Sequence, residues 1–350
     1  MEAEYRALSV GPGLVDRTYR ALLEIEGTDR AAWLHNLTTN QVKNLGRGEG
    51  NYAFVLNIQG RILFDVNVLV RADSIWLDLD RCFLETAKKH FAKYVITEDV
   101  TVVDRSGDFA RFGLVGGQAV ALLADLGASN ASAMAQLSQA NIEWSVADPN
   151  RDCKGAVHAA ANVDRSMAVA VLMVRHDFCG PFGVELFVPR DHAVEFHRAM
   201  IEQHGAIPVG NEAVQVHRIE AGIPWPGHEI TDEYLPAETR QLERAVNYQK
   251  GCYLGQEVVE RMRSRAFVAR QFVGLRIEGS TVPTLKSQIL ESEGKPTGVV
   301  TSACHSPLLD CPNALAYVRT VHSTPGTRLS IAHEGEPNLP VSVVDLPFKA

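Results

Sequence analysis

The sequence has 350 residues, enough for roughly two to three domains. With 46% hydrophobic and 22% charged residues it has a globular composition, which excludes a disordered chain, a coiled coil and a collagen-like fibre. The formal net charge of -8 excludes duplex DNA binding by bulk electrostatics. Six scattered cysteines without a C-x-x-C pair, and an N-terminus without a targeting pattern, favour the cytoplasm. No apolar run approaches the roughly 18 residues of a membrane span.

Apolar periodicity predicts an alternation of strands and helices up to about residue 204. Around Gln59-Gly60 the apolar residues alternate on both sides, which is typical of a β-hairpin. In chain order we expect a strand-like run from 14, a helix after Asp29, the hairpin within 52–70, a strand at 74–80, a helix at 82–94, strands at 98–104 and 109–116, a helix at 118–127, a variable helix and loop over 128–162, strands at 167–177 and 183–189, and a helix at 190–204.

A different pattern begins near Arg270 and continues to the C-terminus. Short strand-like segments follow one another at regular spacing with turn signals between them. They predict an all-β sandwich or barrel of about 80 residues. Together with the mixed elements before it, this predicts an α+β fold rather than a doubly wound sheet.

The densest chemical signal is a segment with one cysteine between two glycines, directly before an expected helix. A thiol near a lysine and a helix N-terminus is in a setting that favours the thiolate. The alternative is a buried structural cysteine in a glycine-rich turn, and the residues alone leave the two interpretations balanced. The segment consists of Lys250, Gly251, Cys252, Tyr253, Leu254, Gly255, Gln256 and Glu257.

Four arginines follow this segment at close spacing: Arg261, Arg263, Arg265 and Arg270. Guanidinium groups match carboxylate and phosphate geometry, so the cluster would suit a polyanion such as an oligoglutamate tail or an RNA backbone. The alternative, slightly favoured here, is a solvated helix face on which Glu257 and Arg261 form an i,i+4 pair.

Two charged residues stand in apolar surroundings. Asp65 lies inside the apolar strand of the hairpin, with Asn67 two residues further on. A carboxylate in such a strand is costly unless it is paired or accepts hydrogen bonds, so Asp65 is a candidate ligand contact. Arg218, in VHRIEAGIP, would bind an acidic ligand or pair with a neighbour such as Glu220.

Other patterns carry weaker signals. Gly113, Gly116 and Gly117 match neither G-x-G-x-x-G nor a P-loop and predict a tight strand-to-helix turn. Cys304-His305 and Cys311 lack the ligand spacing of a tetrahedral site, so we expect no resident metal. No G-x-S-x-G or H-E-x-x-H motif occurs in the sequence.

The octad KGCYLGQE resembles the signature of the YgfZ-type folate-binding proteins, which are relatives of the glycine cleavage T protein, an aminomethyltransferase. Further segments resemble that family over almost the whole chain: LHNLTTNQV, NIQGRILFDVNVLV, VHRIEAGIPWPGHEI and the C-terminal stretch from TSACHS to RLSI.

The resemblance implies a three-part ring around a central channel for tetrahydrofolate, or a folate derivative. It suggests that residues 1–265 form two interleaved α+β subdomains, roughly 1–50 with 160–265 and 51–159, and that 266–350 form an antiparallel β-barrel. By the same resemblance Asp65 faces the reactive end of the folate and Arg218 contacts the pterin, with Asn67 and Arg261 as further contacts. The glutamate that binds the pterin in the T protein falls at Pro181, which implies weaker or rearranged pterin binding.

The resemblance supports two functional hypotheses. The first is a tetrahydrofolate-binding accessory factor that helps assemble or repair iron–sulfur clusters, with Cys252 as the reactive thiol and cluster enzymes, such as those that modify tRNA, as beneficiaries. The alternative is a tetrahydrofolate-dependent aminomethyltransferase, or an N-methyl-group demethylase, in which Asp65 steers the amine. A third hypothesis, an RNA-binding module, depends on the arginine cluster alone, and the acidic charge argues against it, so we expect no direct tRNA binding.

Overall fold

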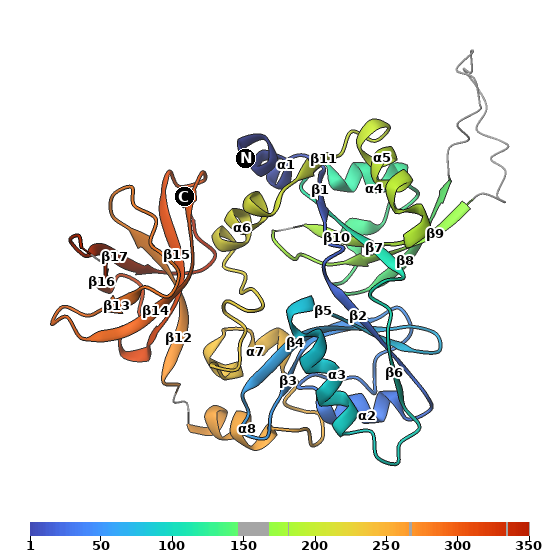
Figure 1. The fold of residues 1–350 in the computed structure, drawn as a ribbon, viewed down its shortest axis with the longest axis horizontal. Coiled ribbons are helices and arrows are strands. Elements are labelled where there is room, and N and C mark those ends of the chain that lie inside the picture. The colour runs from blue at the N-terminus through green and yellow to red at the C-terminus, as the bar shows by residue number, and fades with distance from the viewer. Residues whose placement is uncertain (146–167, 181, 266–267, 334, 350) are drawn as a thin grey trace.

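The computed structural model describes residues 1–145, 168–180, 182–265, 268–333 and 335–349. Two β-sheets and a closed β-barrel surround a central segment that connects them (Figure 1). This confirms the expected α+β class and the C-terminal antiparallel barrel. The helices are α1 (Glu2–Ser9), α2 (Arg30–Leu37), α3 (Leu84–Lys93), α4 (Ala119–Asp125), α5 (Ala193–Glu202), α6 (Asn211–Glu220), α7 (Leu242–Ala245) and α8 (Gln256–Arg265), with short 3-10 helices η1 (Arg81–Phe83), η2 (Ala131–Ala133), η4 (Arg190–His192), η5 (Pro236–Glu238) and η6 (Thr320–His322).

The first sheet has six strands in the order β11-β1-β7-β10-β9-β8. Its core contains apolar side chains from α4 and α5 as well as from the strands. The strand β10 lies in the middle of the sheet and is buried along almost its whole length, as expected for a strand that is apolar except for Glu185. The bounds are β1 (Gly13–Asp16), β7 (Phe109–Val115), β8 (Gln139–Ser145), β9 (Ala168–Arg175), β10 (Gly183–Pro189) and β11 (Ile207–Val209).

The second sheet has five strands in the order β3-β4-β5-β2-β6, and its core includes side chains of α2 and α3. The predicted hairpin is its β3-β4 pair, which turns at Gln59-Gly60. A separate apolar cluster joins residues of both sheets, among them Phe54 of β3 and Phe187 of β10, so the sheets pack against each other. The bounds are β2 (Ala21–Glu26), β3 (Gly50–Leu56), β4 (Ile62–Val70), β5 (Ile75–Leu79) and β6 (Thr101–Asp104).

The C-terminal strands close into a barrel in the order β12-β15-β14-β13-β16-β17, and β17 pairs with β12. The inward-facing aliphatic residues form a core of their own. A second cluster packs the outside of the barrel against α6. The bounds are β12 (Arg270–Ile277), β13 (Gln288–Leu290), β14 (Pro296–Ser306), β15 (Cys311–Arg319), β16 (Arg328–Ile331) and β17 (Leu339–Val344).

Three features differ from the expectations. The N-terminal residues form the helix α1, and part of the stretch expected to be variable helix and loop is the edge strand β8. In β8 the buried Ile142 and Trp144 alternate with exposed residues, as in a strand with one covered face. The sheet pairings also depart from the expected subdomain limits, because β7 and β8 pair within the first sheet and β2 pairs within the second.

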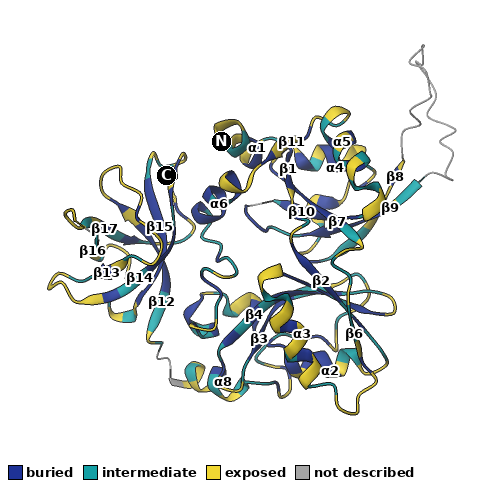
Figure 2. Ribbon diagram, viewed as in Figure 1, coloured by how far each residue is buried: buried dark blue, intermediate teal, exposed yellow. Residues whose placement is uncertain are grey.

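The segment from 221 to 255 has little regular structure and runs between the sheets and the barrel (Figure 1). Buried residues line the meeting faces of the three parts, whereas exposed residues lie on the outer helices and turns (Figure 2). Every helix in the described ranges is too short or too polar to cross a bilayer.

Candidate functional site

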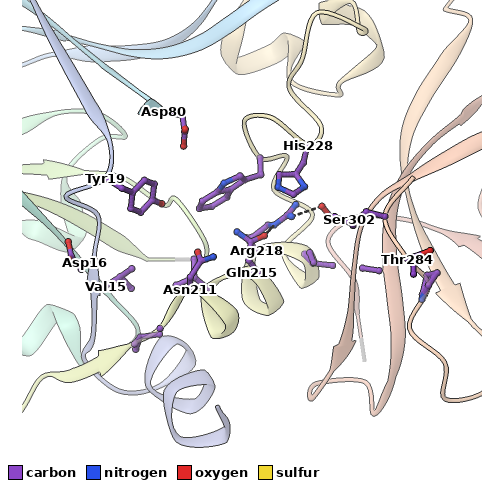
Figure 3. Close-up of a pocket in the computed structure, with 18 residues that line it drawn as sticks. Val15, Asp16, Tyr19, Asp80, Asn211, Gln215, Arg218, His228, Thr284 and Ser302 are labelled. Atoms are coloured by element: carbon purple, nitrogen blue, oxygen red, sulfur yellow. Dashed lines mark hydrogen bonds between the residues drawn. The ribbon is translucent and has the colours of Figure 1, made fainter. Parts of the chain in front are cut away.

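A cavity of about 870 Å³ lies where the first sheet, α6 and the barrel approach one another (Figure 3). Tyr19 and Asp16 line it from the side of the first sheet, and Ser302 and Thr284 line it from the barrel. The remaining lining residues are Val15, Asp80, Val209, Gly210, Asn211, Val214, Gln215, Arg218, Ile219, Trp225, His228, Pro283, Leu285 and Ala303.

Arg218, which the sequence analysis predicted to contact a ligand, lies on α6 at the wall of this cavity. Its side chain is only 1% exposed and donates hydrogen bonds to Gln215 Oε1 (2.9 Å), Glu229 Oε2 (3.0 Å) and Ser302 Oγ (2.5 Å). Glu229 is fully buried and also accepts from the backbone nitrogen of Trp225. Arg218 therefore ties α6, the loop before Ile230 and the barrel together, and holds Gln215 and Trp225 at the cavity wall.

Trp225 also lines a second, smaller cavity, and Asp65 lies in that cavity. The Asp65 carboxyl accepts a hydrogen bond from the Tyr52 hydroxyl at 3.0 Å, and its other oxygen, Oδ1, is buried with no partner among the described residues. Burial raises the pKa of Asp65, and the nearby Arg20 and the Tyr52 hydrogen bond offset this only in part. An unpartnered buried carboxyl oxygen is costly, so it marks a place prepared for a hydrogen-bond donor.

Asn67 lies two residues along β4, as expected, and lines the same small cavity. Its amide nitrogen donates to Asp78 Oδ2 at 2.8 Å, so this nitrogen is already hydrogen-bonded within the protein. Asn67 thus links the small cavity that contains Asp65 to the buried carboxylate of Asp78.

A buried charge network lies behind the small cavity, and it was not predicted from the sequence. Arg20 forms two hydrogen bonds with Asp78 (2.7 and 3.0 Å), and Arg111 pairs with both Asp78 and Glu185. Because the arginines favour the charged carboxylates, the pKa values of Asp78 and Glu185 are lowered. The complete set is Arg17, Arg20, Asp78, Arg111, His176 and Glu185.

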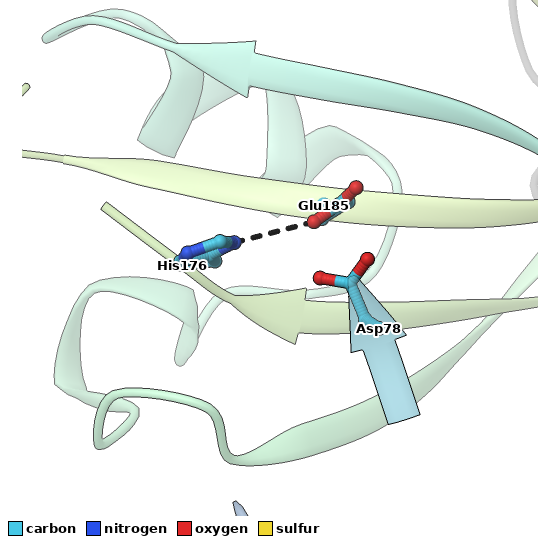
Figure 4. A group of neighbouring side chains, drawn as sticks. All are labelled: Asp78, His176 and Glu185. Carbon is cyan, nitrogen blue, oxygen red and sulfur yellow. Dashed lines mark hydrogen bonds and ion pairs between the residues drawn. The ribbon is translucent and has the colours of Figure 1, made fainter. Parts of the chain in front are cut away.

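Three of these side chains have the donor atoms of a metal site. The ligand atoms of Asp78, His176 and Glu185 lie within 4.8 Å of one another, and His176 Nδ1 is 3.2 Å from Glu185 (Figure 4). Three buried arginines, however, already balance the two carboxylates. A cation would be repelled by these arginines, so the charges do not fit a metal ion.

The cysteine octad lies on the second sheet. It does not line the cavity of about 870 Å³, which we call the central cavity. The Lys250 ammonium is buried and donates to the carbonyl oxygens of His35 (2.5 Å), Thr38 (2.5 Å) and Asn40 (2.8 Å), where α2 ends. Burial and the charge of Lys43 lower the pKa of Lys250 to about 7, whereas the three carbonyl oxygens favour its charged form. Lys250 therefore caps α2.

Cys252 of the octad is a free, exposed cysteine. It opens onto a third cavity of about 620 Å³, lined also by His35, Lys43 and Tyr94. Tyr253 beside it is buried, and its hydroxyl has no hydrogen-bond partner among the described residues. Neither Asp65 nor Arg218 lines this cavity, so the folate candidates and the thiol belong to separate sites.

Gly255 fixes the octad against the β3-β4 hairpin. Its φ is +81°, and a Cβ here would lie 2.7 Å from the backbone oxygen of Asn57. We predict that Gly255→Ala lowers the free energy of unfolding by about 2 kcal/mol or more, from the left-handed backbone and the clash. Urea unfolding measures this, with Gly251→Ala as the control because its Cβ would meet open space and should change stability by less than about 1 kcal/mol. Equal effects of the two substitutions would contradict it.

The arginines after the octad have local partners. Arg261 is exposed on α8 and pairs with Glu257, as the i,i+4 spacing predicts, and it lines neither the central nor the Asp65 cavity. Arg263 stacks over Tyr248, and Arg270 pairs with Glu238. The side chain of Arg265 lies outside the described residues, as does Pro181, where the weaker pterin contact was expected.

Two side chains next to Asp65 were missed at the sequence level: Tyr52 and Arg244. Tyr52 begins the continuous buried run of β3 and carries a polar hydroxyl, which was the available signal, but nothing near Arg244 in the sequence links it to Asp65.

Comparisons with known proteins agree with this architecture. Residues 1–250 match the GCVT N-terminal domain, and residues 270–349 match the glycine cleavage T-protein C-terminal barrel domain. The aminomethyltransferase of Cutibacterium acnes is 29% identical over 350 residues, and that of Saccharopolyspora erythraea is 27% identical over 351, each alignment covering 99% of this chain and 89% of the relative. The structure of aminomethyltransferase T of the glycine cleavage system from Bartonella henselae has the same fold, with a TM-score of 0.83 and 21% identity over 99% of this chain and 89% of that one. The chain therefore belongs to the glycine cleavage T-protein family.

Proposed function

We propose that this protein binds tetrahydrofolate in the central cavity and passes a one-carbon unit to it from an aminomethyl donor beside Asp65. The observation that carries the proposal is the buried Asp65 carboxyl, which has one oxygen without a partner among the described residues and lines a small cavity that shares Trp225 with the large one. The relatives named above are aminomethyltransferases, which supports this alternative over the accessory-factor hypothesis.

The central cavity suits a flat heteroaromatic ligand. Its volume of about 870 Å³ lies within the range of sites for drug-sized molecules. Tyr19 and Trp225 offer aromatic faces, and Asn211 and Gln215 offer amide donors and acceptors of the kind that a pterin requires. Because Arg218 has its donors engaged by the protein, we assign it the role of holding Gln215 and Trp225 rather than gripping the pterin alone.

Asp65 would act on the proton that moves during transfer. Forming methylenetetrahydrofolate bonds the donor carbon to two folate nitrogens, each of which loses a proton, while the bonds from that carbon to its amine and to its carrier group break and each leaving group gains one of the two protons. The ionised Asp65 carboxylate would accept the proton of the first folate nitrogen and, as the carboxylic acid that its raised pKa favours, would return it to the departing amine. The proton of the second folate nitrogen would go to the carrier group.

The proposal is tested by measuring methylenetetrahydrofolate formed from a panel of aminomethyl donors and tetrahydrofolate under anaerobic conditions. We expect product that depends on the protein and on the donor. Saturable tetrahydrofolate binding without product from any donor would overturn the transferase and leave a folate-binding protein.

One observation favours a second candidate, the YgfZ-type accessory factor for iron–sulfur clusters. Cys252 is exposed on its own cavity, while Lys250 and Gly255 hold the octad in place. An exposed thiol held on a fixed backbone is suited to contact a partner protein or a cluster.

We predict that Cys252→Ala changes the free energy of unfolding by less than about 0.5 kcal/mol, because the side chain is exposed. If the second candidate holds, the same variant loses support of a cluster-dependent enzyme in cells under oxidative stress, whereas Cys82→Ala, at another exposed cysteine, keeps it. Full complementation by Cys252→Ala would remove the thiol from the mechanism.

A further inference from the structure

We propose that Arg244 is a positioning residue for the Asp65 carboxyl, to which it is coupled by the ring and hydroxyl of Tyr52. Only the catalytic consequence of this assignment rests on the proposed function. Arg244 lies on α7, more than 170 residues beyond Asp65 in the sequence, yet both line the small cavity.

The three side chains are connected through Tyr52. The guanidinium carbon of Arg244 lies 4.0 Å from the centre of the Tyr52 ring, a cation–π distance. The Tyr52 hydroxyl donates to Asp65 Oδ2 at 3.0 Å, and Asp65 Oδ1 has no partner among the described residues. Because one side chain makes both contacts, holding the Tyr52 ring against Arg244 also holds the Asp65 carboxyl.

The backbone holds Arg244 against Tyr52. The Asn40 side-chain nitrogen donates to the carbonyl oxygens of Tyr52 (2.9 Å) and Arg244 (2.8 Å), bridging β3 and α7. The Thr39 hydroxyl donates to the carbonyl oxygen of Ala245 at 2.6 Å. Two adjacent polar residues thus set the distance between the stacked side chains.

Arg244 is a cation that the described residues leave unbalanced. Within the described ranges no carboxylate forms an ion pair with it, whereas Arg20, the other arginine that acts on Asp65, is held by two hydrogen bonds to Asp78. Its charge therefore acts on Asp65 with little compensation and lowers the pKa of that carboxyl against the effect of burial.

Other charged or titratable groups also face Asp65 or its cavity, and they are unchanged in the variants proposed below. Cys82, on η1, is close enough for Asp65 to raise the pKa of its thiol. Arg17, Arg20, His176 and Asp177 complete the charged lining.

The test is the carboxyl carbon-13 NMR titration of Asp65, assigned by its loss in Asp65→Asn, in the full-length protein. We expect Arg244→Gln to increase the proton affinity of Asp65 by at least about threefold, and Arg244→Lys, which keeps the charge, to give a smaller change. Arg263→Gln is the matched control, because Arg263 stacks over Tyr248 at 4.2 Å and lines neither the central nor the Asp65 cavity. An unchanged Asp65 titration in Arg244→Gln, or an equal change in Arg263→Gln, would overturn the assignment.

A second pair of variants keeps the test decisive if Arg244→Gln fails to fold. Tyr52→Phe removes the hydrogen bond to the charged carboxyl and should also increase the proton affinity of Asp65, whereas Tyr248→Phe should not. An unchanged titration in Tyr52→Phe would contradict coupling through the phenol. The titration needs no substrate, so a protein that shows these shifts but binds no tetrahydrofolate would refute the proposed function and retain the role of Arg244.

Discussion

Replacing Asp65 by Asn is expected to lower one-carbon transfer by about 100- to 10,000-fold, the range for loss of a positioned acid–base group. The amide keeps the shape of the side chain but cannot carry a proton between the folate and the leaving amine. The initial rate of methylenetetrahydrofolate formation at saturating tetrahydrofolate measures this effect. A rate within about threefold of the native protein would exclude Asp65 from the chemistry.

The same variant has an expected stability signature that separates function from folding. Because burial raises the pKa of Asp65 above its unfolded value, the folded protein binds this proton more tightly, and the charged carboxylate costs stability at neutral and higher pH. Asp65→Asn removes that cost. Its Tm should equal or exceed the native Tm at pH 8, and the advantage should vanish as the pH falls below about 4, the ordinary aspartate value. A lower Tm at pH 8 would indicate that the carboxylate stabilises the fold.

Replacing Glu229 by Ala is expected to lower the free energy of unfolding by about 3–5 kcal/mol, the usual effect of removing one partner of a buried ion pair. Arg218 would keep its charge at 1% exposure without a carboxylate, and the Trp225 nitrogen and the Ser302 hydroxyl would each lose an acceptor. Chemical denaturation measures the change, and tetrahydrofolate affinity should fall with it, because Trp225 forms the wall between the two cavities.

A double variant separates the charge from the packing. Arg218→Met with Glu229→Leu replaces the pair by apolar side chains, and it should recover most of the stability lost in Glu229→Ala. If the single variant loses less than about 1 kcal/mol, the ion pair does not hold α6 to the barrel. If the double variant is as unstable as the single one, lost packing rather than the unpaired charge is the cause.

Local patterns were sufficient to predict much of the fold. The hairpin around Gln59-Gly60, the helix closed by Gly127 and the C-terminal strands from Arg270 are confirmed, because each depends on residues close together in the sequence. The edge strand β8 was missed although its sequence, QANIEWS, alternates polar and apolar residues. The surrounding stretch is rich in Ala, Ser, Asn and Gln, and over its whole length the periodicity is weak.

The candidate site was less predictable because its partners come from distant segments. Asp65 and Arg218 both stood out as charged residues in apolar surroundings, and the family resemblance added a folate contact for each. The pairing of Arg218 with Glu229 and Ser302 depends on the docking of the barrel, as the stacking of Arg244 on Tyr52 depends on the placement of α7. Such contacts arise from tertiary packing and leave no periodic trace in the sequence.

The separation of Cys252 from Asp65 changes how the two functional hypotheses relate. The octad lies on the second sheet beside the end of α2, whereas Arg218 lines the central cavity, and Asp65 and Asn67 line the small cavity next to it. A thiol function and a folate function therefore do not need to share a reaction, and variants at the two sites should act independently.

The central claim is that tetrahydrofolate bound in the central cavity presents its reactive end to Asp65 in the adjoining small cavity. A crystal structure of the protein with tetrahydrofolate tests it most directly. The predicted result is a pterin between Tyr19, Gln215 and Trp225, with a reactive folate nitrogen within hydrogen-bond distance of Asp65 Oδ1. A folate bound at the Cys252 cavity, or an empty central cavity at saturating ligand, would contradict the account.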